Sequence, residues 1–214
     1  MSVEALRFSA IVLAAGTSSR MRGRHKLLLP VGGEPVIRRT VRTVLQAQPQ
    51  EVVVVTGFQE RAVSEALAGL PLRLQSNPRF TQGQMTSMAA GAAALGKPTD
   101  AVMVCLGDMV LLTYADYREL VDAFAQLVDR SILVPHHQGQ RGNPVVFAAW
   151  QLPEVISGRR NPGCRRLIAD FPEEVFVYES THDRFVADMD TPDDYVRMVD
   201  RLGLAGIGLQ ARVV

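Results

Sequence analysis

A loop rich in small and basic residues carries the densest charge cluster in the sequence. Four cations lie within the seven residues Arg20–Lys26, and the small residues at 14–19 let backbone N–H groups approach an anion closely. The loop has neither the Gly-Lys-Ser/Thr of a Walker A motif nor the Gly-x-Gly-x-x-Gly of a dinucleotide-binding loop. A solvated basic loop is the alternative. The buried apolar segment Phe8–Ala14 directly before the loop favours phosphate binding.

Three aspartates supply the complementary charge. Asp108 ends the apolar run 101–106, where an acidic residue opposite a phosphate loop is well placed to hold Mg²⁺. Asp188 and Asp190 alternate out of an expected strand at 184–189 and so share one face, where they either complete a metal site or repel each other. The alternatives are a strand-ending turn at Asp108 and helix capping at Asp190.

A polar segment that begins at Asn77 offers groups suited to reading the edge of a base. Gly83 gives backbone freedom, and Thr86 or Ser87 is expected to cap a helix whose N-terminus has free N–H donors. An ordinary capped surface loop is the alternative.

The elements that position these residues follow from the apolar pattern. Continuous apolar runs predict buried strands at 8–14, 51–56, 70–75, 101–106 and 131–135, and helical spacing predicts helices at 35–45, 60–67, 86–95 and 114–128. This alternation predicts an α/β fold with a parallel sheet covered on both faces.

The pattern changes after residue 135. The polar segment 136–143, followed at once by an apolar run at 145–147, predicts a hairpin or an antiparallel insertion. Further helices are expected at 151–157, 163–170 and 192–202, the last capped by Thr191, and strands at 175–178 and 184–189. We expect a single domain over 8–202, and the C-terminal tail 203–214 receives no role.

The composition excludes several classes of protein. With 214 residues, 47% hydrophobic and 21% charged, the chain is neither disordered nor fibrous. A net charge of +1 and 6% aromatic residues argue against a nucleic-acid partner. No apolar stretch approaches the roughly 20 residues of a membrane span. Only two cysteines and no basic-then-apolar leader lead us to expect a soluble cytoplasmic protein without a membrane partner.

Taken together, these motifs resemble those of the MobA-like nucleotidyltransferases. The likeness spans about residues 8–202 and is carried by Leu13-Ala-Ala-Gly-x-Ser-x-Arg-Met, Lys26-x-Leu-x-Pro30, Gly33-x-Pro35, Asn77-Pro, Gly83-x-Met-x-Ser-Met, Gly107-Asp108, Arg141-Gly-Asn-Pro144 and Asp188-x-Asp-Thr-Pro-Asp-Asp194. The combination is specific, although each motif alone is not.

Within that family the opening is similar to that of the members that use CTP on the molybdenum cofactor. Members that use GTP usually read Leu-Ala-Gly-Gly, and Ala15 stands where that glycine would make space for a purine. Two departures from the family pattern are Met109-Val110, where Gln-Pro or Met-Pro usually follows Gly-Asp, and Asn143, where histidine usually stands.

The resemblance implies a three-layer α/β/α Rossmann-like nucleotidyltransferase that transfers CMP from CTP to the molybdopterin cofactor and releases pyrophosphate. It implies catalytic roles for Arg20, Lys26 and Asp108, of which Arg20 and Lys26 would hold the triphosphate. It also implies Mg²⁺ as cofactor, bound by Asp108 with Asp188 or Asp190.

The implied partners are CTP, the molybdopterin cofactor and a molybdoenzyme that receives the product. The expected substrate-binding residues are Leu13, Ala14, Ala15, Gly16, Thr17, Ser18, Asn77, Gly83, Thr86 and Ser87 for CTP, and Arg141 and Asn143 in the acceptor-binding part 136–189. Three alternatives stay open: transfer from GTP, transfer to another phosphorylated acceptor, and a noncatalytic carrier of the cofactor.

Overall fold

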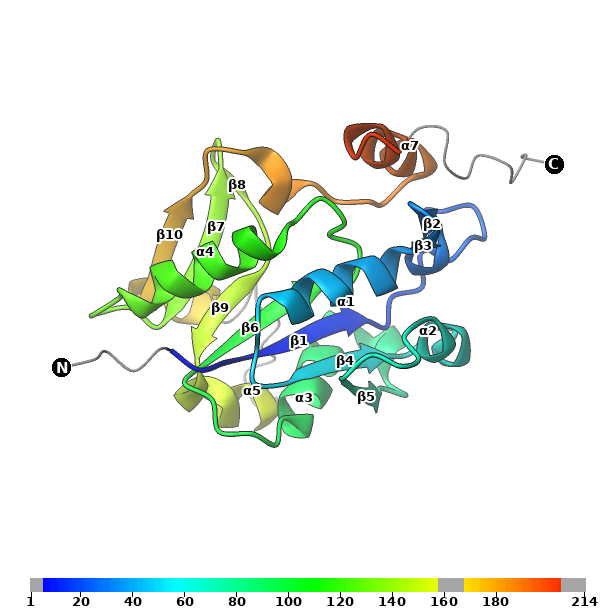
Figure 1. Ribbon diagram of the computed structural model, residues 1–214. Helices are drawn as coiled ribbons and strands as arrows, with labels where there is room; N and C mark the ends of the chain where they lie inside the picture. Colours follow the sequence, from blue (N-terminus) through cyan, green and yellow to red (C-terminus); the bar gives the residue numbers. More distant parts are fainter. Residues whose placement is uncertain (1–5, 158–167, 205–214) are drawn as a thin grey trace.

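The computed structural model describes residues 6–157 and 168–204, which build one mixed eight-stranded sheet flanked by helices. The strand order is β10-β7-β9-β6-β1-β4-β5, with β8 paired to β7 (Figure 1). The strands of this sheet are β1 (Phe8–Ala14), β4 (Val52–Thr56), β5 (Arg73–Ser76), β6 (Ala101–Leu106), β7 (Ile132–His137), β8 (Gln140–Arg141), β9 (Val145–Ala148) and β10 (Val175–Glu179). A separate short ribbon pairs β2 (Pro30–Val31) with β3 (Glu34–Pro35).

The sheet is mostly parallel, as predicted. β1 runs parallel to β4 and β6, β4 to β5, and β7 to β10. Strand β9 is antiparallel to both of its neighbours, β6 and β7, because the chain reverses after β7 and returns between them. The predicted antiparallel insertion is therefore confirmed.

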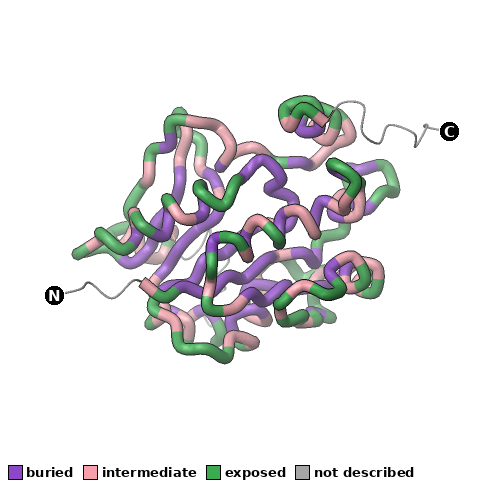
Figure 2. Tube along the Cα trace, viewed as in Figure 1, coloured by how far each residue is buried: buried purple, intermediate pink, exposed green. Residues whose placement is uncertain are grey.

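Helices cover both faces of the sheet and complete three layers. α1 (Val36–Gln46) and α4 (Tyr114–Ala125) lie in front of the sheet in Figure 1, and α3 (Gln84–Ala94) and α5 (Leu152–Ser157) lie on the far side. Successive strand residues point to opposite faces, so Ala10 and Val12 join the front core and Ile11 joins the rear core. Figure 2 shows the resulting buried centre. The predicted α/β/α architecture is confirmed.

Two further helices are α2 (Glu60–Ala66), which follows β4, and α7 (Pro192–Arg201), which is the last helix in the described residues. Thr191 caps α7 through a reciprocal pair of hydrogen bonds with Asp194, as the sequence indicated. None of the helices in the described ranges is long and apolar enough to cross a membrane.

One predicted strand is wrong. Residues Asp183–Val186 form a 3-10 helix, and 187–190 belong to no strand. The buried residues of this segment are Phe185 and Met189, which are four apart, whereas a strand facing one side would bury every second residue. The predicted helix 163–170 falls largely outside the described residues, as does the tail from 205 onward.

Candidate active site

A cavity of about 300 Å³ opens at the carboxyl ends of β1 and β6. The two strand ends touch there, because the Gly107 N–H donates to the Leu13 carbonyl at 3.0 Å. Gly107 has no space for a side chain, since a Cβ would lie 2.8 Å from the Ile37 side chain. The residues that line this first cavity are Leu13, Ala15, Gly16, Lys26, Leu27, Phe80, Gln84, Ser87, Leu106, Gly107, Asp108, Asp188 and Asp190.

Lys26 joins two of the predicted metal ligands. Its Nζ donates to Asp108 in a short contact and to Asp190 at 3.0 Å. Burial acts to lower the pKa of Lys26, but attraction to Asp108 and the hydrogen bonds with both aspartates outweigh it and raise the pKa above its ordinary value. The ammonium is therefore charged at neutral pH.

Three carboxylates converge on this cavity. Partial burial, together with repulsion from Asp108 and Asp190, raises the pKa of Asp188 above its ordinary value. Arg20 pairs with Asp190 at 2.7 Å and offsets part of this negative charge. Carboxylate oxygens are the donors that Mg²⁺ prefers, and Asp108 and Asp190 already contact one ammonium, so the donor types present suit a divalent cation.

The basic loop is anchored by a histidine that the sequence reasoning did not single out. The buried His25 accepts the Leu27 N–H at Nδ1 (3.3 Å), its Nε2 donates to the Phe58 carbonyl (3.2 Å), and its ring stacks on Phe58. Burial lowers the pKa of His25, so the ring is neutral. The Lys26 N–H adds a 3.1 Å bond to Ser18 Oγ. These contacts fix the backbone that presents Lys26.

Asn77 contacts two hydroxyl groups at the start of α3. Its buried amide donates to the hydroxyls of Thr86 and Ser87, both at 2.9 Å, and Ser87 lines the cavity. The predicted cap at Thr86 or Ser87 is wrong, because α3 begins at Gln84 with Gly83 as its N-cap. The Thr86 hydroxyl instead donates to the Gly83 carbonyl at 2.9 Å within the first turn.

The structure brings together part of the predicted set. Of the residues singled out from the sequence, the first cavity is lined by Leu13, Ala15, Gly16, Lys26, Ser87, Asp108, Asp188 and Asp190. Its lining in the described structure does not include Ala14, Thr17, Ser18, Asn77, Gly83 or Thr86. Sequence reasoning missed Phe80 and Gln84, although both lie inside the polar segment it had marked.

A second cavity of about 690 Å³ borders the first and shares Asp188 and Asp190 with it, whereas the predicted catalytic residue Arg20 lines only the second. Its other walls come from the hairpin between β7 and β8, from the 3-10 helix that ends at Val186 with the extended segment after it, and from α7. Neither Arg141 nor Asn143 is among the described residues that line either cavity.

The motif at Arg141 to Pro144 instead holds the second wall in place. The Gly142 N–H donates to the Pro135 carbonyl at 2.7 Å, and the Asn143 N–H donates to the Phe185 carbonyl at 2.9 Å. A Cβ on Gly142 would lie 2.4 Å from the Phe185 carbonyl oxygen. This backbone contact fixes the segment that leads to Asp188.

Asp116, Glu119 and His182 form a further acid–histidine cluster. The buried Asp116 carboxylate accepts bonds from Arg184 and from the Thr113 N–H and hydroxyl, and it pairs with His182 at 3.1 Å. Burial acts to raise the pKa of Asp116, but these bonds outweigh it and lower the pKa. Both oxygens are already bonded, so the cluster joins α4 to the segment around Arg184 and does not fit a metal.

The sequence is similar to a known protein family and to known proteins. Residues 10–175 match the MobA-like NTP transferase domain. Molybdenum cofactor cytidylyltransferase of Escherichia coli (strain K12) is 27% identical over 89% of this chain and 95% of its own length. Nicotine blue oxidoreductase of Paenarthrobacter nicotinovorans is 26% identical over 89% of this chain and 96% of its own.

A solved structure agrees with these matches. A nucleotidyl transferase from Methanothermobacter thermautotroptrophicus is 26% identical and superposes with a TM-score of 0.78, covering 94% of this chain and 99% of that one. The fold is therefore the Rossmann-like α/β fold of nucleotidyltransferases, as the sequence predicted.

Proposed function

The chain belongs to the MobA-like NTP transferase family, and on that premise we propose that it transfers CMP from CTP to the phosphate of the molybdopterin cofactor. The observation that carries the proposal is the first cavity, where Lys26 bridges Asp108 and Asp190 at the ends of parallel strands. Identity to a molybdenum cofactor cytidylyltransferase over nearly the whole of both chains supports the choice of substrates.

The proposed reaction needs no covalent enzyme intermediate. An oxygen of the acceptor phosphate attacks the α-phosphorus of CTP and forms a new P–O bond. The bond from the α-phosphorus to the oxygen that bridges to the β-phosphate breaks, and pyrophosphate leaves with that electron pair. Because the attacking oxygen is already ionised, no general base is required. Catalysis then consists of positioning and charge neutralisation.

The residues of the first cavity, together with Arg20, which pairs with Asp190 at its edge, fit those tasks. Lys26 remains charged at neutral pH and would neutralise the triphosphate together with Arg20, while backbone N–H groups near Gly16 would bind phosphate oxygens. Asp108, with Asp188 or Asp190, would hold Mg²⁺, which when bound neutralises the charge of the phosphates. Without substrate, Lys26 and Arg20 balance these carboxylates.

The choice of base rests on Ala15. Ala15 lines the first cavity, and the residue is 6% exposed. A Cβ added to Gly57 would lie 2.8 Å from the Ala15 Cβ, so the β-carbon is held tightly between the first strand and the β4–α2 loop. A methyl group fixed there narrows the cavity and favours a pyrimidine over a purine.

The competing functions change the partner and keep the fold. GTP could replace CTP, another phosphomonoester could replace molybdopterin, or the protein could carry the cofactor without catalysis. The likeness to an oxidoreductase adds a redox alternative. The retained Lys26 and Asp108 favour an enzyme over a carrier, and the loop after β1 has no Gly-x-Gly-x-x-Gly that would favour a nicotinamide dinucleotide.

Pyrophosphate release from a panel of nucleotides tests the proposal. The protein is incubated with Mg²⁺ and each of CTP, GTP, ATP or UTP, with and without molybdopterin. We expect pyrophosphate from CTP, and only when molybdopterin is present. Release from GTP would reassign the donor, and binding of molybdopterin without release from any nucleotide would identify a carrier.

A further inference from the structure

The two cavities meet at a shared wall made of Asp188 and Asp190, and Arg20 pairs with Asp190 from the side of the second cavity. In a phosphoryl transfer the attacking and leaving oxygens lie roughly in line on opposite sides of the phosphorus. With the triphosphate in the first cavity, the attacking phosphate must therefore approach from the second. The second cavity, at about 690 Å³ against about 300 Å³, has the larger space for the body of an acceptor.

Helix α7 contributes two arginines to this second cavity, Arg197 and Arg201, one helical turn apart. Arg201 is held by Asp183 through two hydrogen bonds of 2.6 and 3.0 Å. Arg197 contacts Asp194 through one nitrogen, and its side chain is 68% exposed. Since a guanidinium has five N–H donors, Arg197 keeps most of its donors for a ligand.

Arg197 is also free to leave its partner. The Asp194 Oδ2 atom already accepts the Thr191 N–H at 2.7 Å, the Thr191 hydroxyl at 2.8 Å and the Asp190 N–H at 3.1 Å, whereas Arg197 contacts only Oδ1. Turning Arg197 toward an anion would not leave this carboxylate unpaired. The bond from Asp190 also places Asp194, and with it Arg197, beside the shared wall.

We propose that Arg197 binds the terminal phosphate of the acceptor and thereby makes the second cavity selective for a phosphomonoester. The inference rests on the proposed function and names the group that recognises its second substrate. A planar guanidinium forms paired, charge-assisted bonds with phosphate oxygens, which suits this role better than a lysine would.

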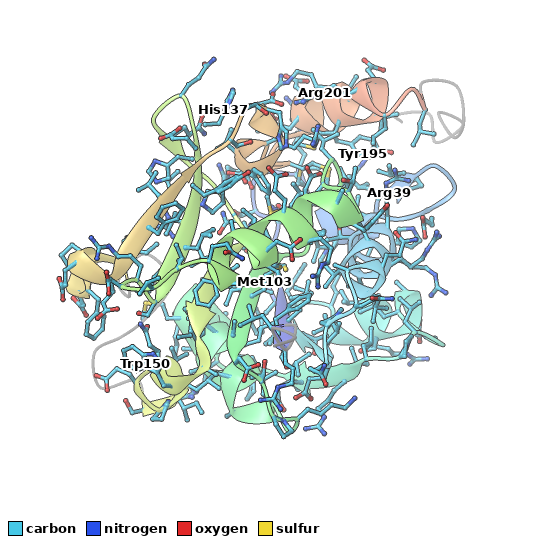
Figure 3. The ribbon with its side chains drawn as sticks, turned by 60° about the vertical axis from the view of Figure 1, so that its left-hand side comes forward. Arg39, Met103, His137, Trp150, Tyr195 and Arg201 are labelled. Atoms are coloured by element: carbon cyan, nitrogen blue, oxygen red, sulfur yellow. The ribbon has the colours of Figure 1, made fainter. Side chains whose placement is uncertain are left out.

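The part of the lining that comes from the hairpin suits a polar heterocycle. His137 and Gln140 reach the cavity from the hairpin, and Figure 3 shows His137 and Arg201 at the same end of the molecule. The His137 Nδ1 lies 2.9 Å from the Ser180 carbonyl, which can only accept, so Nδ1 carries a proton and Nε2 is the ring nitrogen that a ligand could contact. An acceptor lying along α7 would thus have its phosphate at Arg197 and its ring at the hairpin.

The test compares two ligands and two variants by equilibrium binding. The ligands are molybdopterin and the same pterin after removal of its phosphate. The variants are Arg197→Gln and the control Arg61→Gln, which breaks a matched exposed ion pair with Glu65 on α2, outside both cavities. We expect Arg197→Gln to weaken molybdopterin binding about 10- to 100-fold, the worth of a charge-assisted contact, and to leave the dephosphorylated ligand unchanged.

Each outcome bears on the assignment. An unchanged affinity for molybdopterin in Arg197→Gln, or an equal loss for both ligands, would overturn it, as would a wild-type protein that does not prefer the phosphorylated form. CTP binding is measured in parallel and should be unchanged, which shows that the variant is folded. A phosphate preference that depends on Arg197, together with no pyrophosphate release from CTP, would instead defeat only the proposed function.

Discussion

The two cavities are built in different ways. The first lies where parallel strands end, and its Lys26 and Asp108 side chains are 18% and 6% exposed and bonded to each other. The second is bounded by a hairpin and by α7, and its arginines Arg197 and Arg201 are 68% and 43% exposed. Lys26 and Asp108 are thus buried groups fixed by each other, whereas the proposed recognition of the second substrate would use exposed side chains.

This difference has an energetic consequence. Removing one partner of a buried ion pair leaves a charge without compensation, at a cost of about 3 to 5 kcal/mol, while an exposed pair is worth about 0 to 1 kcal/mol. Variants of the first cavity should therefore affect turnover, and variants around the second should affect acceptor binding or the stability of its wall. Each variant below tests that division.

The largest effect is expected from Asp108→Asn. The change removes an anionic metal ligand and leaves Lys26 with only Asp190, so turnover should fall about 100- to 1000-fold, or roughly 3 to 4 kcal/mol. Steady-state pyrophosphate release measures it. The matched control is Asp100→Asn, at the opposite end of β6, where an exposed pair with Arg7 should be dispensable for turnover. An equal fall in turnover in both variants would contradict the assignment of the chemistry to the carboxyl end of β6.

Next comes Asp116→Asn, which weakens the attachment of the second wall to α4. Because Asp116 is buried and bonded to Arg184, we expect the free energy of unfolding at pH 7 to fall by about 3 kcal/mol. The pKa of Asp116 is lowered in the folded state, so its stabilisation is full above the unfolded value near 4 and is lost as the pH falls through the folded value.

Denaturant unfolding at pH 7 and at progressively lower pH measures the effect of this change. The difference in free energy of unfolding between wild type and Asp116→Asn, called the gap below, should become smaller in acid. The control Asp122→Asn removes an exposed pair with Arg118 on the same helix and should change little. A gap that widened in acid would show that the ion pair does not hold the wall.

A smaller effect is expected from Gly142→Ala, which separates the hairpin from the segment leading to Asp188. The new methyl group would meet the Phe185 backbone, so we expect the free energy of unfolding to fall by about 2 kcal/mol. The KM for the acceptor should rise, and the KM for CTP should stay unchanged. Gly96→Ala is the control, because its nearest neighbour is the Arg73 side chain at 3.4 Å. A raised KM for CTP alone would contradict the division between the cavities.

The smallest effect is expected from His25→Gln, at the anchor of the basic loop. Glutamine replaces both hydrogen bonds of the ring imperfectly, so we expect the free energy of unfolding at pH 7.5 to fall by about 1 kcal/mol. The pKa of His25 is lowered in the folded state, so below about pH 6.5 the unfolded chain binds a proton at His25 more readily than the folded protein does. Acid therefore lowers the free energy of unfolding. Between pH 7.5 and pH 5.5 the free energy of unfolding should fall in the wild type, and it should fall less in the variant. An identical loss in both would show that His25 is not the group responsible.

Much of the first cavity was predictable from the sequence. Continuous apolar runs marked β1, β4 and β6 as buried parallel strands, and such strands bring their carboxyl ends to one edge. Lys26 and Asp108, which follow β1 and β6, could then be assigned to one place. His25 could not, because its role depends on Phe58, which is 33 residues away, and no spacing rule reports such a contact.

The second cavity was less predictable. The alternation around Asp188 indicated a strand, but burial of Phe185 and Met189 selects a helical turn followed by an unpaired segment. The sequence identified α7 as a capped helix, yet which of its faces meets the cavity depends on tertiary placement. Arg197 therefore became visible only in the structure.

The central claim is that the acceptor attacks the α-phosphorus of CTP across the wall between the cavities. It is tested most directly by incubating the protein with Mg²⁺, molybdopterin and CTP labelled at either the α- or the γ-phosphorus. We predict that the α-label ends on the molybdopterin product and the γ-label ends in pyrophosphate. Transfer of the γ-label to molybdopterin, or no labelled pterin in either sample, would contradict the account.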